Sequence, residues 1–374
     1  MCGIVGYIGT KAATDVLVDG LRKLEYRGYD SAGISVFEKS KIDVIKAKGR
    51  LDNLEEKRKS QGMPLGTVGI GHTRWATHGE PSDINSHPHG NELVTIVHNG
   101  IIENYLQLKE KLVEKGYKFL SDTDTEVVAI LLDYYYNGNP VETIATVIKS
   151  LKGSYALGIM FQDCQDKIFA VRKDSPLIVG IGEGENFIAS DIPAILKYTR
   201  NYYLLEENEI AVLSRENISI VDTDGDPIPK EALTATWDIE AAEKGGYPHF
   251  MLKEIYEQPT AITNTVSPRI IDGQPDFGIK ALTDDILKSF NKIWIVACGT
   301  AMHAGMVGKS VIEQLARVPV EVDIASEFRY RNPILSPKDD LVIIISQSGE
   351  TAGTLAALRL AKEQCVHTLA VVNG

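Results

Sequence analysis

The chain has 374 residues, 44% hydrophobic and 24% charged, which is typical of a globular protein long enough for two domains. Its 51 acidic residues outnumber 39 lysines and arginines, and the formal charge of −12 disfavours non-specific binding to nucleic acid or to an anionic membrane. The four cysteines form no CxxC pair and no run approaches about 18 apolar residues, so we expect a cytoplasmic protein without a disulfide framework, structural zinc, signal peptide or membrane span.

Short β-rich segments separated by glycine fill residues 1–240, and stretches with helical spacing interrupt them. Strands are expected at GIVGYIG, SAGISVF, IDVIKAKG, TVGIGHTRWATHG, LVTIVHNG, SYALGIMF, KIFAVRK, PLIVGIG, ENFIAS, EIAVLS and ISIVD. Helices are expected at TDVLVDGLRKLEY, IENYLQLKEKLVEKG, DTEVVAILLDYYYNG and PVETIATVIKSLKG. Many strands with several helices predict two packed sheets covered by helices, an α+β layered domain.

The composition changes after residue 240. The stretch WDIEAAEKGGYPHFMLKEIYEQP has alternating charges, a Gly-Gly pair and two prolines, which predicts a domain boundary near Ala241 to Gly246. Residues 241–289 are therefore expected to form a linker and a leading helix.

Residues 290–374 read as β/α units. IWIVACGT, PVEVDIASEF, LVIIISQSGET and HTLAVV are expected strands, and AMHAGMVGKSVIEQLARV and TLAALRLAKEQC are expected helices. This order predicts an open, mostly parallel, doubly wound α/β sheet. Because VVNG is a strand with nothing after it, we expect the sequence to stop inside this domain.

Cys2 is the first candidate catalytic residue. Met1 is routinely removed before a small residue, so Cys2 would carry both a thiol and a free α-amine. A thiol needs a base at neutral pH, and an α-amine with a pKa of about 7.7 to 8.0 can take its proton and return it. Cys2 is thus a candidate N-terminal nucleophile with its own base, and the alternative is a small buried residue at a strand start.

Three further segments contain groups that an amino-acid amide would need. In GHTRWATHG, Arg74 suits a carboxylate, Trp75 is a large apolar cover, and Thr77 and His78 can form hydrogen bonds. The alternative for this segment is a surface loop with a structural tryptophan.

The other two segments are VHNG and SDTDTE. Asn99 and Gly100 of VHNG can form an oxyanion hole, although Asn-Gly is more often a tight turn. A carboxylate of SDTDTE could hold a substrate ammonium, although these residues also cap helices. Together the three segments point to glutamine as substrate.

Two expected strands in the second domain end in polar turns, CGTA and SQSGET, each followed by a helix. Hydroxyls and backbone N–H groups at a helix N-terminus form an anion site, commonly for phosphate. Ordinary Ser and Thr caps explain either turn alone, but two such turns in one parallel sheet favour phosphate binding.

The motifs MCGIVGYIG, LEYRGYDSAG, GHTRWATHG, VHNGIIEN and SDTDTE resemble the glutaminase domain of class II glutamine amidotransferases, which has the N-terminal-nucleophile hydrolase fold with four αββα layers. The resemblance implies Cys2 as nucleophile, Asn99 and Gly100 as oxyanion hole, and Arg74 and Asp124 as ligands of the glutamine carboxylate and ammonium. It further implies that Thr77 and His78 line the site, that Trp75 belongs to a mobile glutamine loop, and that Arg27 of RGYDS lies near the nucleophile.

SQSGET and ACGTxxHAG resemble the sugar isomerase (SIS) domain found in the members of this family that transfer ammonia to fructose 6-phosphate. The resemblance implies sugar-phosphate contacts, and the residues in those positions are Thr300, Ser346, Gln347, Ser348 and Thr351. Ala301 replaces a serine that the family commonly has, which removes one hydroxyl. The family has two SIS domains and is homodimeric at full length, so we expect this chain to hydrolyse L-glutamine but to lack the isomerising residues.

Two other functions remain alternatives. A non-enzymatic sugar-phosphate sensor would use SQSGET as receptor, but it would not need the Cys, Arg, Asn-Gly and Asp groups together. A phosphoribosyl-type amidotransferase would share the first domain, but SQSGET disfavours it. SHPHG suggests a metal site at His87 and His89 only weakly, so we expect no metal and no cofactor.

Overall fold

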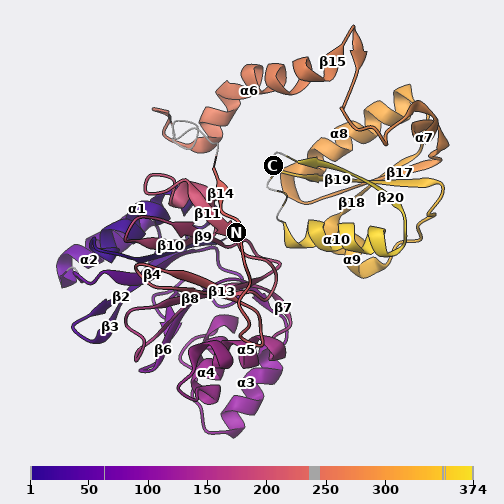
Figure 1. Cartoon of the computed structure of the whole chain (residues 1–374). Helices are drawn as coiled ribbons and strands as arrows, with labels where there is room; N and C mark the ends of the chain where they lie inside the picture. The colour runs from indigo at the N-terminus through magenta and orange to yellow at the C-terminus, as the bar shows by residue number, and fades with distance from the viewer. Residues whose placement is uncertain (1, 63, 236–244, 348, 350, 373–374) are drawn as a thin grey trace. The chain divides into compact units, whose positions relative to one another are not determined.

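The computed structural model describes residues 2–62, 64–235, 245–347, 349 and 351–372. The chain divides into two compact units, Met1–Phe250 and Met251–Gly374 (Figure 1). Within the described residues, no helix is both long and apolar enough to cross a membrane.

Two antiparallel sheets form the centre of the first unit. One has eight strands in the order β14-β11-β9-β10-β1-β4-β2-β3, and the other has six in the order β13-β12-β8-β7-β6-β5. In chain order the strands are β1 (Gly3–Ile8), β2 (Ser31–Glu38), β3 (Lys41–Lys48), β4 (Val68–Arg74), β5 (His89–Gly90), β6 (Val94–Ile102), β7 (Gly153–Phe161), β8 (Ile168–Lys173), β9 (Ile178–Ile181), β10 (Asn186–Ala189), β11 (Asn201–Leu204), β12 (Ile210–Leu213), β13 (Ile218–Val221) and β14 (Leu233–Thr234).

Helices cover the outer face of each sheet. α1 and α2 pack on the eight-stranded sheet, while α4 and α5 pack on the six-stranded sheet with α3 against α4 (Figure 1). Their bounds are α1 (Ala13–Leu24), α2 (Leu51–Gln61), α3 (Tyr105–Glu114), α4 (Asp124–Tyr135) and α5 (Pro140–Ser150), and the short 3-10 helices are Glu25–Arg27 and Ile192–Ala194. The first unit is therefore the predicted four-layer αββα fold.

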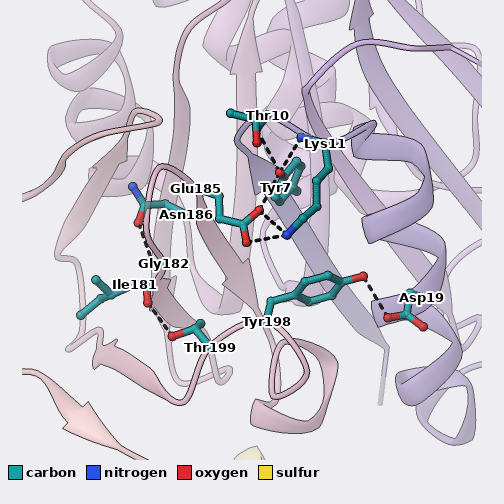
Figure 2. Close-up of polar contacts among 10 residues, drawn as sticks. All are labelled: Tyr7, Thr10, Lys11, Asp19, Ile181, Gly182, Glu185, Asn186, Tyr198 and Thr199. Carbon is teal, nitrogen blue, oxygen red and sulfur yellow. Dashed lines mark hydrogen bonds and ion pairs between the residues drawn. The ribbon is translucent and has the colours of Figure 1, made fainter.

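β1 lies inside the eight-stranded sheet, paired with β10 on one side and β4 on the other. The Tyr7 hydroxyl fixes the turn after this strand: it accepts the N–H groups of Thr10 and Lys11 at 3.1 and 3.0 Å and donates to Glu185 at 2.8 Å (Figure 2). The Lys11 ammonium also pairs with Glu185 at 2.8 Å. Burial and Glu185 raise the pKa of Tyr7 to about 12, so its hydroxyl remains a donor and anchors the end of β1 opposite Cys2.

Ile188 on β10 shows how the two sheets approach each other. Its side chain is fully buried in the layer between them. A Cβ on Gly6 of β1 would lie 2.5 Å from Ile188, and one on Gly158 of β7 would lie 2.7 Å from it. The two glycines thus make room for one isoleucine from both sides.

The second unit contains a parallel four-stranded sheet in the order β18-β17-β19-β20. α8 covers one face, and α9 and α10 pack together on the other (Figure 1), which is the predicted doubly wound arrangement. The bounds are α6 (Phe250–Val266), a 3-10 turn (Ser267–Arg269), β15 (Ile270–Ile271), β16 (Gln274–Pro275), α7 (Asp284–Ser289), β17 (Lys292–Ala297), α8 (Gly299–Leu315), β18 (Val320–Ile324), α9 (Ala325–Arg331), β19 (Asp340–Ser346), α10 (Ala352–Glu363) and β20 (His367–Val372).

The structure corrects the expected elements in several places. The segment PVEVDIASEF is not one strand, because β18 ends at Ile324 and the next residues form α9, which buries Phe328 against Trp294. Helix α2 and strand β11, which lies between β14 and β9, were not expected from the sequence. α2 buries only three of its residues, and β11 has no fully buried residue, so neither has a strong hydrophobic period.

Replacing Ile188 with alanine tests the packing between the sheets. Deleting buried carbons from an isoleucine costs about 2–5 kcal/mol because a cavity remains, so I188A should lower the unfolding free energy by roughly that amount in urea titrations. I84A is the matched control, since Ile84 is 61% exposed and should change stability by less than about 0.5 kcal/mol. Equal effects of the two variants would contradict this packing.

Candidate active site

Strand alternation brings polar side chains from both sheets to one end of the layer between them. Successive residues of a strand face opposite sides, so on β4 His72 and Arg74 follow the buried Ile70 on the same face. On β6, Asn99 follows the buried Val97 in the same way. The inter-sheet layer therefore changes from apolar to polar at the end where Cys2 precedes β1.

Cys2 lies against the backbone of Trp75. The Trp75 N–H donates to the Cys2 sulfur at 3.2 Å, and the thiol lies 3.5 Å from the Trp75 carbonyl oxygen. Burial raises the pKa of the Cys2 thiol, while the Trp75 N–H and the positive charge of Arg74 act in the opposite direction. The thiol thus needs a base to become a nucleophile.

Asn99 links the two sheets beside Cys2. Its Nδ2 donates to the Cys2 backbone carbonyl at 3.0 Å, and its Oδ1 lies 3.0 Å from Nε2 of His72. The side-chain amide is 6% exposed. The structure thereby brings this predicted site residue to the candidate nucleophile.

Gly100 adopts a backbone conformation that excludes other residues. Its φ is +129°, and an added Cβ would lie 2.1 Å from the carbonyl oxygen of Ser154 on the neighbouring strand. The clash is with backbone, so it cannot be relieved by a rotamer change. This Asn-Gly pair therefore lies within paired strand β6 and not in the tight turn that was its alternative.

Arg74 is 3% exposed at the end of β4. Its Nη2 donates to the backbone carbonyls of His78 and Gly79, the latter at 3.0 Å. Its Nη1 is buried and has no hydrogen-bond partner among the described residues. A buried unpaired guanidinium N–H is costly, and a bound carboxylate would satisfy it.

Asp124 is the first residue of α4 and is buried beside this site. The Thr123 hydroxyl caps the helix by accepting the Glu126 N–H. The Asp124 carboxylate is therefore not needed as the helix cap. One oxygen of Asp124 accepts the Ile102 N–H at 2.8 Å, and no described residue donates to the other. Asp124 influences the pKa of both Cys2 and Arg74, so the carboxylate, the guanidinium and the thiol lie near one another.

Asp30 holds the loop after Arg74 through two hydrogen bonds. The Asp30 carboxylate accepts the Ala76 N–H at 2.8 Å, and the backbone N–H of Asp30 donates to the Arg74 carbonyl at 3.0 Å. Trp75 is 47% exposed and meets Tyr29 edge to face at 5.8 Å. Asp30 was not among the predicted site residues, although it belongs to the RGYDS motif.

The other predicted glutamine-site residues, Thr77, His78 and Arg27, contact residues other than Cys2. Thr77 and His78 contact each other at 3.3 Å, and the His78 ring packs against Tyr105. Arg27 donates to the Asp191 carboxylate and to the Tyr26 hydroxyl. The next residue, Gly28, packs directly against the backbone of Arg74 and Trp75, so Arg27 anchors a segment under the loop.

A cluster of buried histidines lies next to Asn99. The His72 and His87 rings stack at 4.1 Å, and His89 and His98 flank His87. Burial lowers the pKa of all four, in His72 to about 3. Within the described part of the chain, no His, Cys, Asp and Glu group is arranged to hold a metal ion.

In the second unit, the two predicted phosphate turns lie side by side. β17 and β19 are parallel neighbours, with Ala297 opposite Ile345, so CGTA and SQSGET follow adjacent strand ends at the point where the strand order reverses. The Ser346 hydroxyl accepts the Gly349 N–H at 3.1 Å, and Thr351 is the N-cap of α10 without a side-chain cap bond. Thr300 of CGTA and Gln347 of SQSGET are both exposed. Ser348 lies outside the described residues.

Comparison with known families identifies both domains. A model of the glutamine amidotransferase domain matches residues 72–197, and a model of the SIS domain matches residues 286–374. The expected resemblances of both parts of the chain are thereby confirmed.

Curated relatives match the whole chain. A glutamine–fructose-6-phosphate aminotransferase (isomerizing) of Caldanaerobacter subterraneus is 59% identical over all of this chain and 62% of its own length. The corresponding proteins of Clostridium tetani and Methanosarcina acetivorans are 58% and 49% identical, again with 62% of each relative covered. The chain thus spans a little under two thirds of the length of these relatives.

Solved structures confirm the fold class. Glutamine phosphoribosylpyrophosphate amidotransferase from B. subtilis aligns with a TM-score of 0.54 and 18% identity, over 99% of this chain and 81% of its own. At this identity the likeness concerns the fold alone.

Acidification should destabilise the first unit through the histidine cluster. The four histidines are neutral when folded and titrate near pH 6.5 when unfolded, so below pH 6.5 the unfolded chain binds more protons and stability falls. The loss has an upper limit of about 1.4 kcal/mol per pH unit for each histidine. Urea unfolding followed by circular dichroism between pH 7 and 5 measures it, because carboxylates titrate mostly below this window.

The variant H87Q removes one of these buried histidines and should reduce this pH slope. A wild-type unfolding midpoint that is the same at pH 7 and pH 5 would contradict the neutral, buried state of the cluster.

Proposed function

From its glutamine amidotransferase and SIS domains, and its relation along the whole chain to glutamine–fructose-6-phosphate aminotransferases, we propose that the protein hydrolyses L-glutamine and releases ammonia for transfer to a sugar phosphate. The observation that carries this proposal is the buried, unpartnered guanidinium N–H of Arg74 near the Cys2 thiol, together with the Asp124 carboxylate near both. Arg74 has a buried guanidinium N–H without a partner, and Asp124 has a carboxylate oxygen without a donor among the described residues.

The proposed reaction begins at Cys2 after removal of Met1. The free α-amine takes the thiol proton, and the thiolate attacks the side-chain amide carbon of glutamine. The Asn99 Nδ2 and the Gly100 N–H stabilise the oxyanion. The C–N bond then breaks as the amine returns the proton to the leaving nitrogen, which departs as ammonia and leaves a glutamyl thioester.

Water completes the cycle by hydrolysing the thioester to glutamate and restoring the thiol. The α-amine removes a proton from this water, and the same oxyanion hole stabilises the second tetrahedral intermediate. The raised pKa of the Cys2 thiol supports the need for an adjacent base.

Substrate binding follows from the charges. The free Nη1 of Arg74 would hold the α-carboxylate, and the open oxygen of Asp124 would hold the α-ammonium. Trp75, Thr77 and His78 form the loop that would cover the bound substrate. Arg27 would act from a distance by fixing the segment on which this loop rests.

The second half of the proposal concerns the acceptor. The adjacent turns CGTA and SQSGET support a phosphate site formed by Thr300, Ser346, Gln347, Ser348 and Thr351. Fructose 6-phosphate is the proposed sugar phosphate and glucosamine 6-phosphate the proposed product, as the names and chemistry of the relatives suggest. Complete transfer and a homodimeric state are proposed for the full length that the relatives have, and the cysteine-poor, acidic composition supports a cytoplasmic location.

The two alternatives are less well supported. A sugar-phosphate sensor has no use for a nucleophile flanked by Arg74 and Asp124. A phosphoribosyl-type amidotransferase shares the fold of the first unit, but the match of residues 286–374 to the SIS domain supports a different acceptor.

Cys2→Ala should abolish glutamine hydrolysis, because no other thiol has the required neighbours. Glutamate release is measured by an enzyme-coupled assay, and mass spectrometry establishes that Met1 has been removed. C365S, which changes an exposed cysteine of the second unit, should retain wild-type activity. Full activity of C2A would overturn the proposed mechanism.

Ser346→Ala should weaken binding of fructose 6-phosphate about tenfold, since a hydrogen bond to a charged phosphate contributes roughly 1.5–3 kcal/mol. Isothermal titration calorimetry measures the Kd, and S289A, at the distant end of α7, serves as control. Unchanged affinity in S346A would show that this turn does not hold the phosphate, and would leave the glutaminase proposal intact.

A further inference from the structure

We infer that His72 is a positioning residue for glutamine hydrolysis: its imidazole holds the Asn99 amide in the orientation that directs Nδ2 toward the nucleophile. The inference rests on the proposed function, because it assigns a role within the same site. His72 acts through Asn99 and does not itself need to contact the substrate.

The partners of Asn99 determine which way its amide faces. The backbone carbonyl of Cys2 can only accept a hydrogen bond, so the group 3.0 Å from it must be the NH₂ of Asn99. The amide oxygen then faces Nε2 of His72 at 3.0 Å. This second contact is attractive only when Nε2 carries a proton.

The surroundings of His72 favour that protonation state. The ring is completely buried and stacks on His87 with an interplanar angle of 11°. Burial lowers the pKa of His72 to about 3, although Asn99 and the His98 backbone act in the opposite direction. The ring is therefore neutral with one N–H, and the tautomer with that proton on Nδ1 would set the Nε2 lone pair against the oxygen of Asn99.

Hydrogen bonds from strand β6 and helix α4 fix the ring of His87, which stacks on His72. The His98 backbone N–H donates to Nδ1 of His87 at 3.2 Å, so the His87 proton is on Nε2, which faces the Thr125 hydroxyl at 3.4 Å. Thr125 in turn lies 2.9 Å from Nδ1 of His98. Because His87 is oriented from two sides, the plane of His72 is constrained as well.

Losing the His72 donor removes one of the two contacts that orient the Asn99 amide. Rotation of the amide by half a turn would then aim its oxygen at the developing oxyanion. Removing one oxyanion-hole donor costs about 10²–10³ in kcat. The defect should appear in kcat with little change in KM, because Arg74 and Asp124, the proposed glutamine ligands, are unaffected.

A matched pair of amide substitutions tests the inference. Glutamine can place an N–H where Nε2 of histidine lies, whereas asparagine is too short. H72N should lower kcat for glutamine hydrolysis at least 30-fold with KM within about threefold of wild type, and H72Q should recover kcat to within about fivefold. H303N, which removes an exposed histidine of α8 in the second unit, should retain kcat within about twofold.

A double-mutant cycle separates positioning from general damage. In an N99A background, H72N should cause no further loss of kcat, because the group on which His72 acts is absent. Equal losses in both backgrounds, an H72Q as impaired as H72N, or an H72N with wild-type kcat would each overturn the inference.

Nitrogen NMR of ¹⁵N-histidine-labelled wild-type protein gives a test that does not depend on whether the variants fold. Its expected result is a neutral His72 with the proton on Nε2, and a proton on Nδ1 would overturn the inference. Wild-type protein without glutaminase activity, or active C2A, would instead refute the proposed function, so the two failures are distinguishable.

Discussion

The hydrogen bonds of Asn99 cross the layer between the two sheets, and the arrangement of the site depends on them. Elsewhere this layer is filled by apolar side chains such as Ile188, which need no directional partner. At the end near Cys2 it contains amide, imidazole and guanidinium groups, and buried polar groups are stable only when paired. Asn99 meets this requirement by bonding His72 and the Cys2 backbone, both on the opposite sheet. The same contacts that stabilise the layer therefore fix an amide N–H beside the thiol.

Arg74 departs from this rule, and its departure is informative. Its Nη2 donates to two carbonyls of the loop that follows, while its Nη1 is buried without a partner among the described residues. The loop is thus built partly around the cation, and it also supplies the N–H that contacts the Cys2 sulfur. Binding a carboxylate at Arg74 would consequently affect the segment that covers the thiol. With the proposed binding of a carboxylate at Arg74, substrate binding and the position of the loop over the thiol would be linked through Arg74 and Trp75.

The sequence was sufficient to predict the layers and most strands, because strand alternation is local. The grouping of Cys2, Arg74, Asn99, Gly100 and Asp124 was expected from the chemistry of the motifs together with their resemblance to class II glutamine amidotransferases. It was insufficient for α2, whose period is weak, and for α9, where β-rich residues continue into a helix because Phe328 packs on Trp294. His72 was also missed. Its two-residue spacing from Arg74 signals a shared face, but its contact with Asn99 depends on how the two sheets are stacked, which no local pattern specifies.

The neutral histidines explain how the site can be buried and polar without accumulating charge. Four imidazoles cluster here, three of them near the charge of Arg74 and His98 near that of Asp124. Protonating them would place additional positive charge beside Arg74, and burial opposes this by lowering each pKa. Each neutral ring can donate from one nitrogen and accept at the other, so His87 can accept from the His98 backbone and face Thr125 at once. Histidine therefore provides directional links in this layer without the desolvation cost of another buried charge.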